Sequence, residues 1–589
     1  MQMFEPQSVS HTPFLFFTGK GGVGKTSTAC ATAVSLADLG KKVLIVSTDP
    51  ASNLQDVFEI ELTSEPKQIP HTENLYACNL DPEEAASKYR ERVIGPYRGL
   101  LPQSVLVTME EQLSGACTVE IAAFDEFTNL LTNTDLVEEY DYILFDTAPT
   151  GHTIRLLQLP LAWSGYLEES THGASCLGPL SGLGEKKEIY EKTVNALSDP
   201  SQTTLLIVTR PESSSFYEAE RASKELRELG INNQRLIING VLQRQIENDP
   251  ISHAFYKRQQ EAIENIPNGL KEITTFSLPF VSYTLTGLEH LRLLFSNSNE
   301  MSTMTEETVI DDKSVSSIKS LISSFSEQGT RIIFTMGKGG VGKTTVASMI
   351  AVGLVEKGHK VHLTTTDPAA HLDLMFQAEN NNDLLTISRI NPTHEVEVYK
   401  NEVVRNASAT LNEEALAYLE EDLNSPCTEE IAVFRAFAAM VEKSKDEVIV
   451  IDTAPTGHTL LLLDAAEAYH KEIARSTGEV PESVRNLLPR LRNKTETSVV
   501  IVTLAEATPV LEASRLQEDL KRADIIPTWW IINQSLYTTK TIDPILNGRA
   551  KAEKAWIQKV TSELATKCTI LPWFPEEKVG YESILQSLE

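Results

Sequence analysis

The strongest constraint on the fold of this chain is an internal repeat that covers most of its sequence. The segment FLFFTGKGGVGKTS at 14–27 returns as IIFTMGKGGVGKTT at 332–345. The segment YILFDTAPTGHT at 142–153 returns as VIVIDTAPTGHT at 448–459. Such self-similarity indicates repeated structural units, so the 589 residues contain two copies of one large unit rather than several unrelated domains.

The boundaries of the copies follow from composition. We expect an N-terminal half over 1–295, a linker over 296–329 and a C-terminal half over 330–589. The linker is rich in Ser, Thr, Glu and Asp and poor in aromatic residues, which is typical of flexible segments. A short helix is compatible with the sequence of 314–325.

Each half alternates short apolar runs with longer amphipathic stretches. Continuous apolar runs are typical of strands buried on both faces, and their alternation with helices favours a mostly parallel, doubly wound sheet. Helices are expected over 81–140 and 400–446. The strands expected in the first half are 14–18, 43–47, 142–145, 205–209, 235–238 and 276–280.

Composition excludes several classes of partner. The formal net charge of −30 argues against nucleic acid and against broad docking on an anionic membrane. No apolar run is long enough to cross a bilayer, and the first 19 residues contain neither Lys nor Arg, so we expect no secretory leader and a cytoplasmic protein. The six cysteines include no CxxC pair, and a reducing compartment favours free thiols or ligands over disulfides.

Both halves contain a GxxxxGK[ST] motif between an apolar run and an Ala-rich segment, the context of a phosphate-binding loop, or P-loop. Backbone N–H groups and a helix N-terminus would surround the phosphates, a lysine would reach the β- and γ-phosphates, and a threonine would bind Mg²⁺. The fold class is therefore α/β, with two homologous P-loop halves. The candidate ATP-binding residues are Gly19, Gly21, Gly22, Gly24, Lys25 and Thr26, and Gly337, Gly339, Gly340, Gly342, Lys343 and Thr344.

Four aspartates follow apolar runs and are candidates for the magnesium and water chemistry. Asp49 and Asp367 lie in TDPA, whereas Asp146 and Asp452 end YILFD and VIVID. Carboxylates there can bind Mg²⁺ through water or orient the attacking water. Capping of a helix is the structural alternative for an aspartate after a strand.

Each loop has the form KGGVGKT and so resembles the deviant P-loop of the ATPase class that contains MinD, the nitrogenase iron protein and the arsenite-pump ATPases. The resemblance implies that Lys20 and Lys338 reach across a dimer interface to the partner nucleotide, so the halves would pack as an internal pseudo-dimer. It also implies water activation by Asp49 and Asp367 and a metal-side role for Asp146 and Asp452. Asn239 and Asn533, each in IIN, match the adenine-contacting position, although an Asx turn would also explain them.

The segment DTAPTGH joins an aspartate at the γ-phosphate to a histidine in both halves, as a switch segment would. Here the chain closely resembles the family of arsenical pump-driving ATPases, ArsA. In that family cysteines, with His and Ser positions, bind As(III) or Sb(III) between the halves. The matching positions are Cys117, Cys176, Cys427, His152, His458 and Ser425.

Soft thiolates suit this soft ligand. The second half has no counterpart of Cys176 between 459 and 532. The other cysteines, Cys30, Cys78 and Cys568, are expected to be buried structural thiols.

The resemblance implies an ATPase that uses ATP and Mg²⁺ to drive arsenite or antimonite efflux, with metalloid binding stimulating hydrolysis. The chain would be a monomer recruited to the inner face of the membrane by an ArsB-type carrier, and a small arsenic metallochaperone could deliver the ion. The main alternative is an ATPase that targets tail-anchored membrane proteins. Such factors are usually single-half homodimers with a CxxC and a Met-rich groove, whereas this chain is a double with nine Met. Two further classes fit less well. An iron–sulfur scaffold of this ATPase class requires a CxxC, and a MinD-like regulator requires a C-terminal amphipathic helix.

Overall fold

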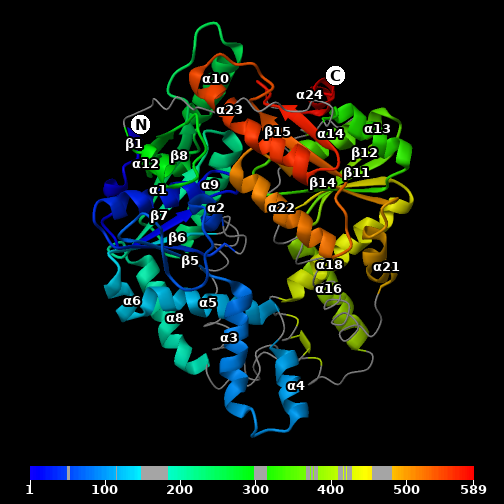
Figure 1. Ribbon diagram of the computed structural model, residues 1–589. Helices are drawn as coiled ribbons and strands as arrows, with labels where there is room; N and C mark the ends of the chain where they lie inside the picture. Colours follow the sequence, from blue (N-terminus) through cyan, green and yellow to red (C-terminus); the bar gives the residue numbers. More distant parts are fainter. Residues whose placement is uncertain are drawn as a thin grey trace. The chain divides into compact units, whose positions relative to one another are not determined.

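The computed structural model describes residues 1–49, 53–113, 116–147, 183–296, 315–366, 382–408, 427–453, 481–576 and 578–588, with single residues between 367 and 426. The chain divides into two compact units, shown in Figure 1. Unit 1 comprises Met1–Glu247 and Phe255–Ser302, and unit 2 comprises Asn248–Ala254 and Thr303–Glu589. Seven residues of the expected N-terminal half, Asn248–Ala254, thus group with the second half.

Unit 1 contains, in its described residues, a nine-stranded sheet of order β1-β9-β8-β7-β2-β6-β3-β5-β4. All its pairings are parallel except that of β4 with β5. All six expected strands are present. The strands are β1 (Gln2–Met3), β2 (Phe14–Thr18), β3 (Val43–Ser47), β4 (Lys67–Gln68), β5 (Leu75–Asn79), β6 (Tyr142–Asp146), β7 (Thr203–Thr209), β8 (Gln234–Val241) and β9 (Thr274–Pro279).

Helices cover both faces of this sheet, because side chains alternate along each buried strand. Leu15 and Phe17 of β2 pack with the helix after the P-loop, whereas Phe14 and Phe16 pack on the opposite face. The helices are α1 (Lys25–Asp38), α2 (Leu54–Phe58), α3 (Pro82–Ile94), α4 (Gln103–Gln112), α5 (Ala116–Thr132), α6 (Thr134–Glu139), α8 (Leu183–Ser198), α9 (Ser213–Glu228), α10 (Pro250–Glu264), α11 (Asn268–Lys271) and α12 (Leu288–Leu293). The first residues of α10, as far as Ala254, group with unit 2.

Unit 2 repeats this arrangement with an all-parallel sheet of order β12-β11-β13-β10-β14-β15-β16 in the described residues. Its strands are β10 (Ile332–Met336), β11 (Val361–Thr365), β12 (Leu385–Arg389), β13 (Val448–Asp452), β14 (Thr497–Thr503), β15 (Trp529–Ser535) and β16 (Cys568–Pro572). Its helices are α13 (Ile318–Gln328), α14 (Lys343–Glu356), α16 (Pro392–Ala407), α18 (Cys427–Glu442), α21 (Glu482–Leu491), α22 (Ala507–Arg522), α23 (Pro544–Lys559) and α24 (Tyr581–Gln586). The alternation of apolar and amphipathic segments therefore identified the α/β class correctly.

The short helix compatible with 314–325 is present as α13, and it packs on the P-loop helix of unit 2. Its Leu321, Ile322 and Phe325 are buried in the same cluster as α14. A Cβ on Gly353 of α14 would lie 2.4 Å from the Ile322 Cδ1 atom, so a glycine is needed for this close approach. Part of the segment between the copies is thus folded onto the second half.

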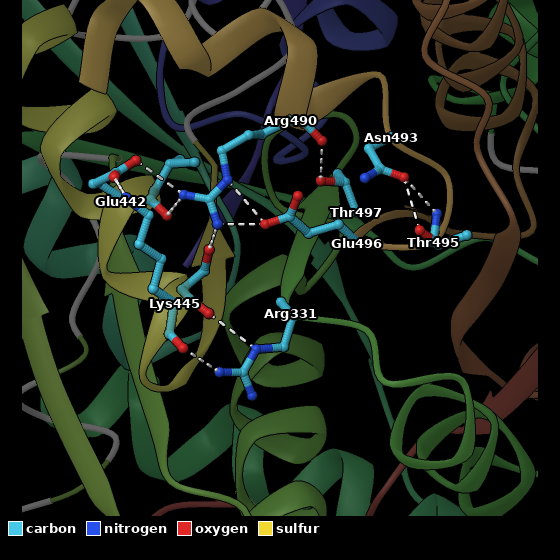
Figure 2. Close-up of polar contacts among 10 residues, drawn as sticks. Arg331, Glu442, Lys445, Arg490, Asn493, Thr495, Glu496 and Thr497 are labelled. Atoms are coloured by element: carbon cyan, nitrogen blue, oxygen red, sulfur yellow. Dashed lines mark hydrogen bonds and ion pairs between the residues drawn. The ribbon is translucent and has the colours of Figure 1, made fainter. Parts of the chain in front are cut away.

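The guanidinium group of Arg490 joins three elements of unit 2 through hydrogen bonds and ion pairs, as Figure 2 shows. Arg490 of α21 donates to Glu496 before β14, to Glu442 and the Val441 carbonyl at the end of α18, and to Ser444. All five of its N–H groups are therefore used. This network fixes the C-terminal end of α18, the helix that begins at Cys427, against the sheet.

Candidate functional site

Both P-loops adopt backbone conformations that require glycine. Gly19 and Gly24 have φ angles of +151° and +89°, and Gly337 and Gly342 have +147° and +88°. A Cβ on Gly19 would lie 2.1 Å from the Val208 carbonyl oxygen of β7. A Cβ on Gly337 would lie 2.1 Å from the Val502 carbonyl oxygen of β14. The glycines thus allow the loop to pass directly over the neighbouring strand.

The second lysine of each KGGVGKT motif lies inside its loop. Lys25 is 7% exposed and its Nζ donates to the Gly19 carbonyl at 3.0 Å. Lys343 is 6% exposed and its Nζ donates to the Lys338 carbonyl at 3.0 Å. Each loop therefore places a buried ammonium at the N-terminus of a long helix, where the helix dipole also favours anions.

A threonine hydroxyl and an aspartate carboxylate come together in each half. Thr26 Oγ1 donates to Asp146 Oδ2 at 2.8 Å, and Thr344 Oγ1 donates to Asp452 Oδ2 at 2.7 Å. Both carboxylates are 1% exposed. Because the P-loop strand and the aspartate strand are hydrogen-bonded neighbours, their carboxyl ends bring these groups to one edge of the sheet.

Asn239 and Asn533 hold the P-loops. Their Nδ2 groups donate to the carbonyls of Val23 and Val341, each at 2.9 Å. A Cβ on Gly24 would lie 2.3 Å from Asn239 Nδ2. The structure therefore gives each asparagine a bracing role that the sequence did not suggest, while the adenine contact stays a prediction.

Lys20 and Lys338 were predicted to serve the nucleotide of the opposite half. That role stays a prediction. In this structure Lys338 is ion-paired with Glu512 of α22 in its own half, where the side chains are 16% and 7% exposed. The counterpart of Glu512 in the repeat is Glu218 of α9, which pairs with Arg221 at 2.8 Å. Both glutamates occupy the same position in the repeat, 294 residues apart, but their partners differ, so the repeat marks the glutamate and not the ion pair.

The remaining predicted residues are placed only in part. Asp49 lies after β3, and its backbone N–H donates to Ser47 Oγ at 3.2 Å. Cys117 is the second residue of α5 and Cys427 is the first of α18, so both belong to first helical turns; their side chains are outside the described residues. Asp367, His152, Cys176, Ser425 and His458 also lie outside the described residues.

The three cysteines expected to be structural are buried. Burial, and secondarily the nearby Asp146 carboxylate, raises the pKa of Cys30. Burial raises the pKa values of Cys78 and Cys568 to about 12. These thiols stay protonated at neutral pH and are therefore poor metal ligands.

Residues 12–298, 330–477 and 462–588 match the family model described as anion-transporting ATPases. An arsenical pump-driving ATPase of Acidiphilium multivorum is 47% identical over 573 residues, which cover 97% of this chain and 98% of that protein. A protein of the same name from Escherichia coli is 47% identical over 572 residues, with the same coverage. An ATPase GET3 of Eremothecium gossypii is 30% identical over 305 residues, which cover 47% of this chain and 87% of that protein. Among the described residues, no helix is both long and apolar enough for a membrane span.

Proposed function

Because this chain belongs to the family of anion-transporting ATPases, we propose that its ATP hydrolysis drives the efflux of arsenite or antimonite. The chain is an ATP hydrolase. The observation that carries the proposal is the pairing of a threonine hydroxyl with a buried aspartate beside a P-loop in each half. The arsenical substrate is suggested by the names of relatives that match nearly the whole chain.

The residues present fit Mg²⁺ in both halves. Hydroxyl and carboxylate oxygens are hard ligands of the kind that this ion prefers, and Thr26 with Asp146, or Thr344 with Asp452, would hold it directly or through water. Bound Mg²⁺ would neutralise charge on the β- and γ-phosphates. Lys25 and Lys343 would bind the same phosphates, and the loop N–H groups would orient them.

We assign activation of the attacking water to Asp49 and Asp367, and charge stabilisation across the interface to Lys20 and Lys338. Asp49 supports this role by its place directly after β3, at the carboxyl edge of the sheet that carries the P-loop. Lys338 would have to leave Glu512 to reach the opposite nucleotide. The ion pair would therefore restrain this lysine until the halves close.

For the metalloid we propose Cys117, Cys176 and Cys427 as thiolate ligands, with His152, His458 and Ser425 as accessory groups. Support comes from helix position, because a cysteine in a first helical turn has its thiolate stabilised by the helix N-terminus. Three-thiolate binding across the halves would favour a closed pseudo-dimer and so stimulate hydrolysis.

We further propose that the chain acts in the cytoplasm and associates with an ArsB-type membrane carrier, which would form the path for the ion. Delivery by a small arsenic metallochaperone fits the same scheme. Targeting of tail-anchored proteins is the alternative function. It is less well supported, because the chain is a covalent double and its six cysteines include no CxxC.

Equilibrium dialysis of antimonite, with metalloid measured by elemental analysis, tests the ligand assignment. Cys117→Ser and Cys427→Ser should each lower the affinity by about tenfold or more, because losing one of three thiolates weakens a soft site at least as much as losing an outer partner. Cys78→Ala is the matched control, since that thiol is buried and protonated. Equal binding by all four proteins would remove the cysteine assignment.

A further inference from the structure

Asp249 and Asp543 occupy equivalent positions in the repeat, and the nucleotide chemistry above does not use either of them. They lie 294 residues apart, the same spacing that separates Asn239 from Asn533. Each precedes the proline that begins a long helix, α10 or α23. Both side chains are buried, with 3% and 2% exposure.

Each carboxylate uses one oxygen to cap its own helix. Asp249 Oδ1 accepts from two backbone N–H groups in the first turn of α10, at 2.9 and 3.1 Å. Asp543 Oδ1 accepts from two N–H groups in the first turn of α23, at 2.9 and 3.2 Å. These are ordinary N-caps, and proline at the first helical position is typical of them.

The second oxygen of each carboxylate binds the other segment. Asp249 Oδ2 accepts from the Thr541 hydroxyl at 2.6 Å and from the backbone N–H groups of Ile542 and Asp543 at 2.7 and 2.9 Å. Asp543 Oδ2 accepts from the Ser252 hydroxyl at 2.6 Å. These contacts lie within unit 2, to which Asn248–Ala254 belongs. We call the four side chains of Asp249, Ser252, Thr541 and Asp543 the capping node.

Ten residues further along, each helix binds the loop that follows the asparagine of its own half. Gln259 of α10 accepts from the Leu242 N–H at 2.8 Å and donates to the Gly240 carbonyl at 2.9 Å. Glu553 of α23 accepts from the Ser535 hydroxyl at 2.7 Å and from two N–H groups, both at 3.1 Å. Ten helical residues span about 15 Å.

A continuous path therefore runs from the capping node to each P-loop. It passes through a helix, through Gln259 or Glu553, and through the strand end that carries the bracing asparagine. Helices transmit displacement as stiff rods, and packed polar networks shift between discrete arrangements rather than deforming smoothly.

We propose that the capping node couples the two ATP sites, with Asp249 and Asp543 as positioning residues for nucleotide binding. The coupling is reciprocal, because linkage requires each site to alter the other by the same factor. The node acts through loop position and touches no nucleotide itself. The proposed coupling involves ATP binding only, so it can be tested without any metalloid.

Replacement by asparagine should disrupt the capping node at Asp249 but not at Asp543, and the test uses this difference. Asp249→Asn keeps an oxygen for its own cap but turns an NH₂ group toward three donors, so it breaks the node. Asp543→Asn keeps its cap, and its NH₂ group can donate to the Ser252 hydroxyl, which can reverse its role. Asp199→Asn is the matched control outside the node, since the Asp199 side chain is only partly buried and accepts hydrogen bonds from the neighbouring residues Ser201 and Gln202.

The measurement is the dissociation constant of a fluorescent ATP analogue at the first site, in the full chain, with and without Lys343→Ala to block the second site. We expect the block to change this constant by about fivefold or more, the size of ordinary coupling. Asp249→Asn should reduce the change to less than about twofold, whereas Asp543→Asn and Asp199→Asn should retain it.

Three results would overturn the proposal: no effect of the block in the wild-type chain, full coupling in Asp249→Asn, or equal loss of coupling in Asp199→Asn. If Asp249→Asn does not fold, Thr541→Val decides, because it removes one donor and leaves both caps intact. Unchanged coupling in that variant would equally overturn the proposal.

Discussion

Lys338 is held by Glu512 within its own half, and the two side chains are 16% and 7% exposed. This lysine belongs to the P-loop, whereas the glutamate lies on α22. In the role that we propose for Lys338 at the opposite nucleotide, this ion pair acts as a restraint on the lysine.

Glu512→Gln should raise the basal rate of ATP hydrolysis, because it removes the charge that restrains Lys338. A restraint of about 1 kcal/mol corresponds to about a fivefold change in rate. Glu218→Gln, at the equivalent position in unit 1, is the control, and its glutamate pairs with Arg221. Steady-state phosphate release measures both. A lower rate in Glu512→Gln would mean that the pair supports the active arrangement instead.

Thr26→Val and Thr344→Val should each raise the Mg²⁺ concentration needed for half-maximal hydrolysis. Valine keeps the shape of threonine but removes the oxygen that lies 2.8 or 2.7 Å from the aspartate. We expect an increase of about tenfold or more for each site that turns over. A magnesium titration of both variants therefore also shows whether the two sites contribute equally; an unchanged requirement in both would remove these threonines from the metal site.

Asn239→Asp should weaken ATP binding more than Asn239→Ala. The alanine variant loses one hydrogen bond to the Val23 carbonyl, worth about 1 kcal/mol. The aspartate variant places a negative oxygen against that carbonyl and beside the phosphates. Isothermal titration with ATP measures both changes, and the reverse order of affinities would show that Asn239 is not a P-loop brace.

The effect of Glu553→Gln on the free energy of unfolding should become more favourable as pH rises. Burial raises the pKa of Glu553 above its ordinary value of 4.5, although its hydrogen bonds and Arg549 oppose the shift. A raised folded-state pKa means that stability is lost as pH rises from 4.5 through the folded value, because the folded state must release a buried proton. Glutamine avoids that loss, as Gln259 does in unit 1.

The difference in Tm between Glu553→Gln and the wild-type chain should therefore grow from pH 5 to pH 8. Thermal denaturation at several pH values measures it. A difference that is constant with pH would show that Glu553 does not titrate differently in the folded chain.

Local sequence patterns predicted the sheets and the positions of the two glycine-rich loops. Strands such as 43–47 are apolar on both faces, and the glycines of GKGGVGKT are needed by the backbone itself. Strand β5, which lies next to the edge strand β4, was missed, because its sequence LYACN is only partly apolar and two of its side chains are partly exposed.

Side-chain partners distant in sequence were not predicted. The ion pair of Lys338 with Glu512 joins residues 174 apart, and the capping node joins residues more than 290 apart. Charged residues on helices carry no local mark of their partner. The repeat offers the one usable signal, because equivalent residues such as Asp249 and Asp543 recur at a fixed spacing.

The rate of ATP hydrolysis as a function of arsenite concentration tests the central claim most directly, because it links the P-loops to the proposed metalloid ligands in one measurement. The wild-type chain should show a saturable rise in rate, and Cys117→Ser or Cys427→Ser should shift that rise to higher arsenite while retaining ATP binding. A folded, ATP-binding wild-type chain whose rate does not change with arsenite or antimonite would contradict the account.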